Sequence, residues 1–197
     1  MVALVMDALP PAEAPTMTFQ DFLIWEPGDG RSWQLVDGVP QPMAPTNRTH
    51  GALQMELARL IGNHLEQAGS TCTVIGEPGI QPRVLGASNV RIPDLGVSCT
   101  PYADEEQLLS GAVLLVEVLS PSNQAETWSN VWTYTTIPSV QEILVLHSAA
   151  VAADVIRRGS DGLWPDAPVH IVDGDLLLGS ISFRVPLRQV YRTTRLA

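Results

Sequence analysis

Two carboxylates stand within apolar segments of the sequence where strands are expected. Asp94 lies in the segment 90–97, and Glu117 lies near the end of the continuous apolar segment 112–119. An ionised carboxylate is costly in a core strand unless a partner compensates it. A divalent cation is the commonest partner for two convergent acids, and hydrogen bonds from loop backbone or from an arginine are the alternative. If the two strands are neighbours, both side chains can point to one place near the strand ends and hold a metal ion.

The elements that must position these acids can be predicted from hydrophobic periods and turn residues. Apolar residues recur at three- and four-residue steps between positions 53 and 65, which predicts an amphipathic helix that ends before Gly69. The pair Asp37-Gly38 predicts the turn of a hairpin over 33–43. The other expected elements are a short helix after Thr18, strands over 72–80, 90–99, 112–119, 142–146 and 151–157, a helix over 124–135, and short strands between 170 and 191. This order predicts an α/β or α+β fold with one central mixed β-sheet flanked by helices.

Composition limits the size of the fold and the partners of the protein. The chain has 197 residues, of which 45% are hydrophobic, so we expect a single domain over 16–197 and a flexible tail at 1–15. The formal net charge is −10, and all 11 residues counted as lysine or arginine are arginine. Any mechanism that requires a lysine of this chain is therefore excluded. The excess of acidic over basic residues disfavours DNA as a partner without excluding it.

The two cysteines and the N-terminal segment bear on the compartment. Cys72 and Cys99 have no paired spacing and are expected to be free thiols of a reducing compartment. The N-terminus lacks the basic and apolar regions of a signal peptide, and no apolar run approaches the ~18 residues of a membrane span. We therefore expect a cytoplasmic protein with no membrane segment. Apolar strand edges make a homodimer the expected assembly.

Short motifs around the two acids stand in a recognisable order. Ile92-Pro93-Asp94 is followed about twenty residues later by Val116-Glu117-Val118-Leu119-Ser120-Pro121-Ser122. The pattern continues in Trp33-Gln34-Leu35-Val36-Asp37-Gly38, in Met43-Ala44-Pro45 before His50, and in Tyr134 before Ile137-Pro138-Ser139-Val140-Gln141-Glu142. From Thr16 to about Tyr191 the sequence thus resembles the "putative restriction endonuclease" domain family. That family is common in bacteria and belongs to the PD-(D/E)XK nuclease superfamily.

The resemblance implies a central mixed sheet flanked by helices and the hydrolysis of DNA phosphodiester bonds by metal-activated water. In that scheme Asp94 and Glu117 hold Mg²⁺ (or Mn²⁺), and the backbone carbonyl of Val118 completes the shell. Glu56, on the long helix, is the candidate for an accessory acid that acts through water, with a solvated surface acid as the alternative. His50 falls on the helix face that turns towards the sheet, so it is a candidate beside the cleft or a structural residue at the helix N-terminus.

The sequence departs from the family pattern at two charged positions. The resemblance places the superfamily lysine either at Leu119, two residues after the second acid, or at Asn130, four residues before Tyr134. Asn130 can hydrogen-bond a water but supplies no net charge, and loss of one such group typically lowers rates by ~10²–10³. Gln34 stands where the family has a glutamate. The resemblance therefore implies a degenerate active site.

Two functions from different classes remain open. The first is a Mg²⁺-dependent endonuclease with a degenerate site, in which Asp94, Glu117 and Asn130 occupy the catalytic positions. The alternative is a non-catalytic module that keeps the nuclease fold and binds a protein partner or nucleic acid. An arginine could replace the lysine: Arg83 lies in a loop that could reach the site, whereas Arg91 would point to the face opposite Asp94 in an unbroken strand.

Overall fold

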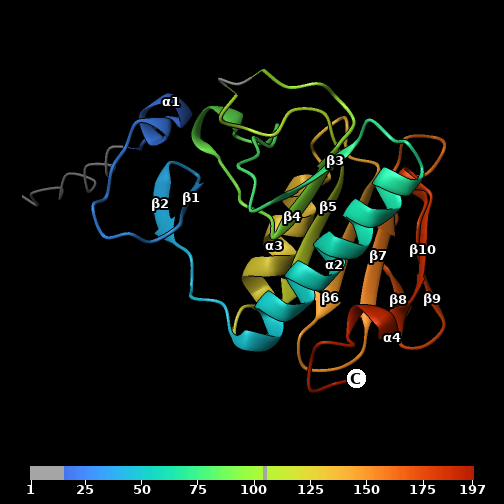
Figure 1. Ribbon diagram of the computed structural model, residues 1–197. Coiled ribbons are helices and arrows are strands. Elements are labelled where there is room, and N and C mark those ends of the chain that lie inside the picture. The colour runs from blue at the N-terminus through green and yellow to red at the C-terminus, as the bar shows by residue number, and fades with distance from the viewer. Residues whose placement is uncertain (1–15, 104–105) are drawn as a thin grey trace, which may run out of the picture.

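A mixed β-sheet forms the centre of the protein (Figure 1). The computed structural model describes residues 16–103 and 106–197, so the tail expected at 1–15 lies outside the described residues. The sheet has six strands in the spatial order β3-β4-β5-β6-β7-β8. These strands are Thr73–Gly76 (β3), Leu95–Ser98 (β4), Ala112–Leu119 (β5), Glu142–His147 (β6), Ala153–Arg157 (β7) and Val169–Ile171 (β8). Strands β5 and β6 are parallel and the other neighbours are antiparallel, which confirms the predicted fold class.

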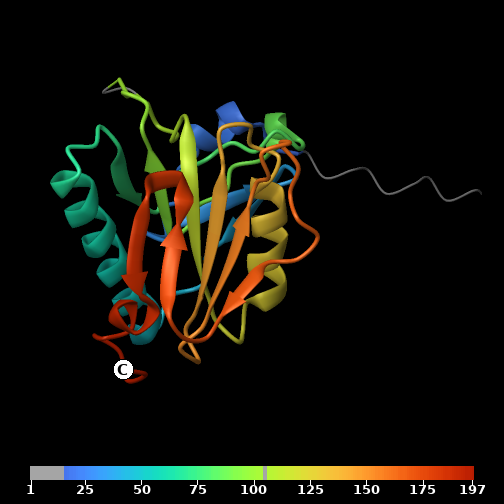
Figure 2. The same ribbon diagram turned by 90° about the vertical axis from the view of Figure 1, so that its right-hand side faces the viewer.

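Helices cover both faces of this sheet. The remaining elements are α1 (Phe19–Leu23), β1 (Trp33–Val36), β2 (Val39–Pro42), α2 (Arg48–Gln67), a 3₁₀ turn at Gly86–Ser88, α3 (Gln124–Tyr134), β9 (Asp175–Leu178), a 3₁₀ turn at Gly179–Ile181, β10 (Phe183–Pro186) and α4 (Leu187–Val190). Figure 2 shows the sheet between α2 and α3, with the β9–β10 pair and α4 on the side of α2. Across the two described ranges, no helix combines the length and the apolar character that crossing a membrane requires.

Helix α2 follows the period that predicted it. It buries a stripe made of Leu53, Leu57, Leu60, Ile61 and Leu65 against the sheet. Its N-terminus is capped by Asn47, whose side chain accepts a hydrogen bond from the backbone N–H of His50 at 3.0 Å. This cap fixes the place where α2 begins, at the end of the sheet that carries the two acids.

Strand β5 is buried on both faces, which explains its continuous apolar sequence. Leu114 and Val116 pack in the core beneath α2, whereas Leu115 and Leu119 pack in the core beneath α3. Glu117 has the parity of Leu115 and Leu119, so its carboxylate lies on the α3 face of the sheet.

The predicted hairpin is formed by β1 and β2, which pair antiparallel through a two-residue turn. Asp37 and Gly38 both have positive φ angles, 50° and 80°, as a primed turn requires. Leu35 of β1 exchanges two backbone hydrogen bonds with Val90, at 2.8 and 3.0 Å. The hairpin is therefore attached to the segment that leads into β4.

Only the second half of the segment 90–99 pairs as a strand of the central sheet. Strand β4 begins at Leu95, while Val90 and Arg91 make single bridges to Leu35 and Ile80. Pro93 has no backbone N–H for a ladder. Asp94 consequently stands at the beginning of a strand rather than in its interior.

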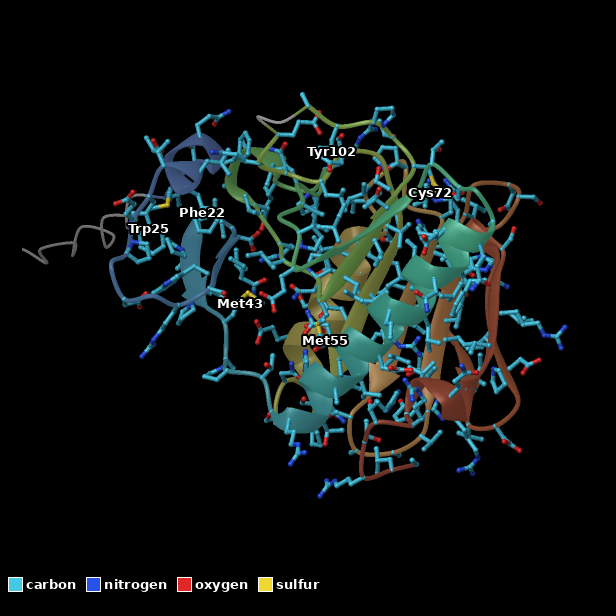
Figure 3. The ribbon with its side chains drawn as sticks, in the orientation of Figure 1. Phe22, Trp25, Met43, Met55, Cys72 and Tyr102 are labelled. Carbon is cyan, nitrogen blue, oxygen red and sulfur yellow. A yellow bond between two sulfur atoms is a disulfide. The ribbon has the colours of Figure 1, made fainter. Side chains whose placement is uncertain are left out.

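Cys72 and Cys99 form a disulfide, so the prediction of two free thiols is wrong. Cys72 precedes β3 and Cys99 follows β4, and these strands pair with Thr73 opposite Ser98. The antiparallel register brings the two sulfurs together across 27 residues of sequence, which cysteine spacing alone did not indicate. Figure 3 labels Cys72 near the C-terminal end of α2.

Candidate functional site

The two predicted metal ligands face each other at one end of the sheet. Leu95 of β4 pairs with Val116 of β5, so the preceding residue, Asp94, stands across from Glu117. Both acids are buried, with exposed fractions of 6% and 7%. They line a small cleft of about 70 Å³, to which the hairpin, the beginning of α2 and α3 also contribute. Met43, another lining residue, lies between the hairpin and the two helices in Figure 3.

Hydrogen bonds hold both carboxylate oxygens of Asp94. Nε2 of His50 lies 2.7 Å from Oδ1 of Asp94, and the backbone N–H of Val118 donates to Oδ2 at 2.6 Å. In addition, Nε2 of Gln54 donates to the backbone oxygen of Asp94 at 2.9 Å. His50 and Gln54 are one helical turn apart, so the first turns of α2 fix the orientation of this acid. The structure thus brings His50 into the cleft.

Val118 turns its backbone polar groups towards Asp94. In a strand, the N–H and C=O groups of one residue point to the same edge, as the paired exchange in an antiparallel ladder requires. Because the N–H of Val118 bonds to Asp94, its carbonyl also points to the β4 edge. The carbonyl of the next residue, Leu119, accepts from the N–H of Ser148 on the opposite edge. Val118 is therefore oriented to contribute an oxygen beside the two carboxylates.

Glu117 lies in an environment that disfavours its charge. Burial and the negative charge of Asp94 raise the pKa of Glu117 well above its ordinary value. The hydroxyl of Tyr134 donates to Oε1 of Glu117 at 2.5 Å, and burial together with Glu117 raises the pKa of Tyr134 well above its ordinary value, so that it remains a donor. A cation between the acids would favour their ionised forms. The pair is thus a carboxylate site in which a divalent cation would offset the repulsion between the two acids.

A polar face of α3 forms another wall of the cleft. Glu126, Asn130 and Tyr134 recur every four residues and share one side of the helix. Nε2 of Gln34 donates to Oε1 of Glu126 at 2.7 Å, whereas Oε1 of Gln34 is buried without a partner among the described residues. Asn130 is buried and lines the cleft together with Glu117. Neither Glu126 nor Tyr134 was predicted as a site residue, although their four-residue spacing from Asn130 could have indicated both.

Glu56 does not line this cleft. Its carboxylate accepts hydrogen bonds from Arg59 at 2.7 Å and from Arg192 at 2.6 Å. The bonds from Arg59 make the largest contribution to lowering the pKa of Glu56. With an exposed fraction of 5%, it is not a solvated surface acid either. Glu56 instead ties the C-terminal segment after α4 to α2.

No arginine lines the cleft in the part of the chain that the structure describes. Arg91 is buried, and its Nη1 donates to the backbone oxygen of Leu35 at 3.3 Å. Arg83 is exposed in its loop and is also absent from the lining. Positive charge inside the cleft must therefore come from His50, when it is protonated, or from a bound cation.

A mixed sheet between helices, with two opposed acids where neighbouring strands begin and end, agrees with the nuclease fold that the sequence resemblance implies. The chain belongs to the Uma2 family, described as "Putative restriction endonuclease", whose model matches residues 19–186. The family predicted from the sequence is therefore confirmed.

One curated relative and one solved structure show how far these similarities extend. The relative is the uncharacterized protein slr1290 of Synechocystis sp. (strain ATCC 27184 / PCC 6803 / Kazusa), which is 29% identical over 157 residues, or 79% of this chain and 81% of the relative. A crystal structure titled as a putative nuclease belonging to DUF820, from Anabaena variabilis ATCC 29413, superposes with a TM-score of 0.72. It covers 89% of this chain and 98% of that chain at 14% identity, a likeness that shows the shared fold.

Proposed function

We propose that this protein is a divalent-metal-dependent endonuclease that hydrolyses DNA phosphodiester bonds slowly, because its site is degenerate. The observation that carries the proposal is the buried, opposed pair of Asp94 and Glu117, where the charge of Asp94 helps to raise the pKa of Glu117. These two carboxylates and the carbonyl of Val118 are oxygen ligands of the kind that Mg²⁺ and Mn²⁺ prefer. The donor set therefore fits a hard divalent cation.

Each residue of the cleft has a role that follows from its contacts. When bound, Mg²⁺ or Mn²⁺ would supply an activated water and positive charge at the phosphate. Asp94 and Glu117 would hold the cation, while His50 and Tyr134 orient the two carboxylates through their hydrogen bonds. Asn130 can donate a hydrogen bond to a water or a phosphate oxygen but cannot offset the developing negative charge.

The alternative of a non-catalytic module is supported by the electrostatics of the same cleft. Glu126 adds a third carboxylate to the lining, and the amide of Gln34 occupies one of its oxygens. With the formal net charge of −10, this acidic wall disfavours the approach of DNA and favours a protein partner. Self-association as a homodimer stays a prediction, which the mass measured by size-exclusion chromatography with light scattering would test.

The first experiment is calorimetric titration of the full chain with Mn²⁺ and with Mg²⁺. We expect the wild type to bind one cation, and Asp94→Ala to lose that binding. Glu56→Gln is the matched control, because it also removes a buried acid but lies outside the cleft. A folded wild type that binds neither cation would contradict the metal-dependent function.

Nicking of supercoiled plasmid in Mn²⁺ separates the two candidate functions. The endonuclease proposal predicts slow nicking that Asp94→Ala abolishes. Metal binding without nicking, in a wild-type protein that retains its fold, would favour the non-catalytic module. Capture of a protein partner by Asp94→Ala as well as by the wild type would then place the partner surface outside the acid cleft.

A further inference from the structure

Three neighbouring strands each bring one metal-ligating side chain to the same face of the sheet. His147 ends β6, Asp154 lies in β7 and His170 lies in β8. Asp154 pairs directly with His170, and it pairs on its other side with Val145. His147 lies two residues beyond Val145 and therefore has the same parity. All three side chains thus project from one face of the sheet. Their strands lie side by side in the sheet (Figures 1 and 2).

The three side chains converge on the carboxylate of Asp154. Nε2 of His147 lies 2.6 Å from Oδ2 of Asp154, and Nδ1 of His170 lies 2.7 Å from Oδ1. One ligand atom from each residue can be chosen so that all three lie within 4.8 Å of one another. The two imidazole rings are nearly perpendicular, at 74°, with their centroids 5.7 Å apart. The rings therefore approach the same carboxylate from two directions.

Burial and charge indicate that this cluster can hold a cation. The side chain of Asp154 has an exposed fraction of 7%, and within the described part of the chain it forms no ion pair with an arginine. Its hydrogen-bond partners are the two imidazoles, and imidazole nitrogen is the commonest metal ligand in proteins. The side chain of His170 is 54% exposed, so solvent reaches one side of the cluster. A buried carboxylate, two imidazoles and one open side match an open four-coordinate metal site.

The backbone that carries His147 is held in place. The hydroxyl of Tyr191 donates to the backbone oxygen of Ala152 at 2.6 Å and also lies 2.9 Å from that of His147. The N–H of His147 donates to the same oxygen of Ala152 at 3.0 Å. These bonds hold the connection between β6 and β7 in place and thereby fix the backbone that carries His147.

We propose that His147, Asp154 and His170 form a second site, which binds a divalent transition metal of the Zn²⁺ type. Imidazole nitrogen with one carboxylate is a ligand set that suits Zn²⁺, whereas the all-oxygen cleft suits Mg²⁺ and Mn²⁺. Metal–ligand distances of ~2.0–2.2 Å would require both imidazoles to draw back from Asp154, because their nitrogens lie 2.6 and 2.7 Å from its carboxylate oxygens. The competing possibility is a metal-free brace, in which the two imidazoles satisfy Asp154 and attach β8 to the sheet.

The proposed zinc site is separate from the acid cleft and does not depend on the proposed function. Glu117 pairs with Val145, which pairs with Asp154, so the two sites are two strand spacings apart, or roughly 10 Å. Because Zn²⁺ could also enter the cleft through His50, the test should be made with the cleft disabled. The variant Asp94→Ala provides that background.

The experiment is titration of tag-free full chain with Zn²⁺, with Co²⁺ absorption as a spectroscopic readout of the ligand set. We expect one Zn²⁺ per chain in Asp94→Ala, and visible Co²⁺ bands typical of low coordination number. Adding His170→Gln to that background should weaken Zn²⁺ binding by at least ~10-fold. Mutation of residues that only hydrogen-bond to a metal's ligands already changes metal affinity on this scale. Glutamine removes the imidazole ligand but retains an N–H that can donate to Asp154.

A matched control and two contrary outcomes complete the test. His64→Gln removes a histidine outside both clusters, where its Nε2 lies 3.0 Å from the backbone oxygen of Ile181, and should leave Zn²⁺ affinity unchanged. Equal Zn²⁺ affinity with and without His170→Gln would overturn the proposal and leave only adventitious binding. Absence of Zn²⁺ binding by folded Asp94→Ala would overturn it in favour of the metal-free brace. Neither outcome bears on Mn²⁺ binding by the cleft of the wild type.

Discussion

The hydroxyl of Tyr134 donates a hydrogen bond to Oε1 of Glu117 across the packed interface between α3 and β5. Glu117 stands across from Asp94, so this bond connects a helix residue to the acid pair at the end of the sheet. The donor favours the charged form of Glu117, while burial and Asp94 disfavour it. If the cleft binds a cation as proposed, the balance among these contributions sets the pH at which it does so.

Removing the Tyr134 hydroxyl should therefore shift metal binding to higher pH. Tyr134→Phe deletes the donor that lowers the pKa of Glu117, and it leaves a buried acceptor at a cost of about 1–3 kcal/mol in stability. We expect weaker Mn²⁺ binding near neutral pH and recovery at alkaline pH, measured by calorimetry across that range. Tyr191→Phe is the control, since that hydroxyl bonds to backbone oxygens away from the cleft. Superimposable pH profiles for Tyr134→Phe and wild type would contradict this role.

Stability without metal should fall as pH rises, because folding raises the pKa of Glu117 above its ordinary value of 4.5. Between the unfolded and the folded pKa, the folded state retains a proton that the unfolded chain has released. The contribution of Glu117 to the free energy of unfolding is therefore fully present below the unfolded pKa and is lost as pH rises through the folded pKa. Glu117→Gln removes the buried carboxylate. At high pH its free energy of unfolding should therefore exceed that of the wild type by about 1.4 kcal/mol for each unit by which folding raises the pKa of Glu117.

Urea unfolding in a chelator, at several pH values, measures this difference. Mn²⁺ should restore stability to the wild type at high pH but not to Glu117→Gln, because only the wild type keeps both acids. Parallel pH–stability curves for the two proteins would show that Glu117 ionises normally in the folded state.

Restoring a cation at position 130 should increase catalysis. Asn130→Lys places an ammonium in the lining of the cleft beside Glu117, where it can stabilise the developing phosphate charge. We expect Mn²⁺-dependent plasmid nicking to rise by ~10² or more. Ser129→Lys, which adds the same charge at an exposed neighbouring position on α3, should not reproduce the gain. If Asn130→Lys folds and binds Mn²⁺ but nicks plasmid no faster than the wild type, Asn130 is not the position of the missing lysine.

The disulfide between Cys72 and Cys99 should contribute substantially to stability. It closes a loop over a sequence separation of 27, for which loop entropy predicts about 3–4 kcal/mol. Reductant should lower the urea midpoint of the wild type by a corresponding amount and leave Cys72→Ser/Cys99→Ser unchanged. Mass spectrometry after alkylation of freshly purified protein checks whether the bond is present. If the wild type is as stable in reductant as without it, the bond is not a structural element in solution.

Local patterns predicted the elements that carry the candidate site. The three- and four-residue period identified α2, and the continuous apolar run identified β5 as a strand buried on both faces. Strand parity, together with the motifs around Asp94 and Glu117, was sufficient to expect two acids at one point. These features depend on residues near each other in sequence, which is why a single sequence contains them.

Side-chain partners that are distant in sequence were not predictable in the same way. In the structure, Gln34 hydrogen-bonds to Glu126, 92 residues away in sequence, and Glu56 hydrogen-bonds to Arg192, 136 residues away. It also joins Cys72 to Cys99. Each of these contacts depends on how helices and strands are placed against one another, and nothing in the local sequence specifies that placement.

The sequence by itself determined the order of elements, the family and the paired acids, because periodicity and short motifs are local properties. The tertiary structure alone decided the strand register, and with it the disulfide, the polar face of α3 in the cleft and the cluster around Asp154. The physical reason is that a slip of one residue in a strand moves every side chain to the opposite face, and only the packed sheet selects the register.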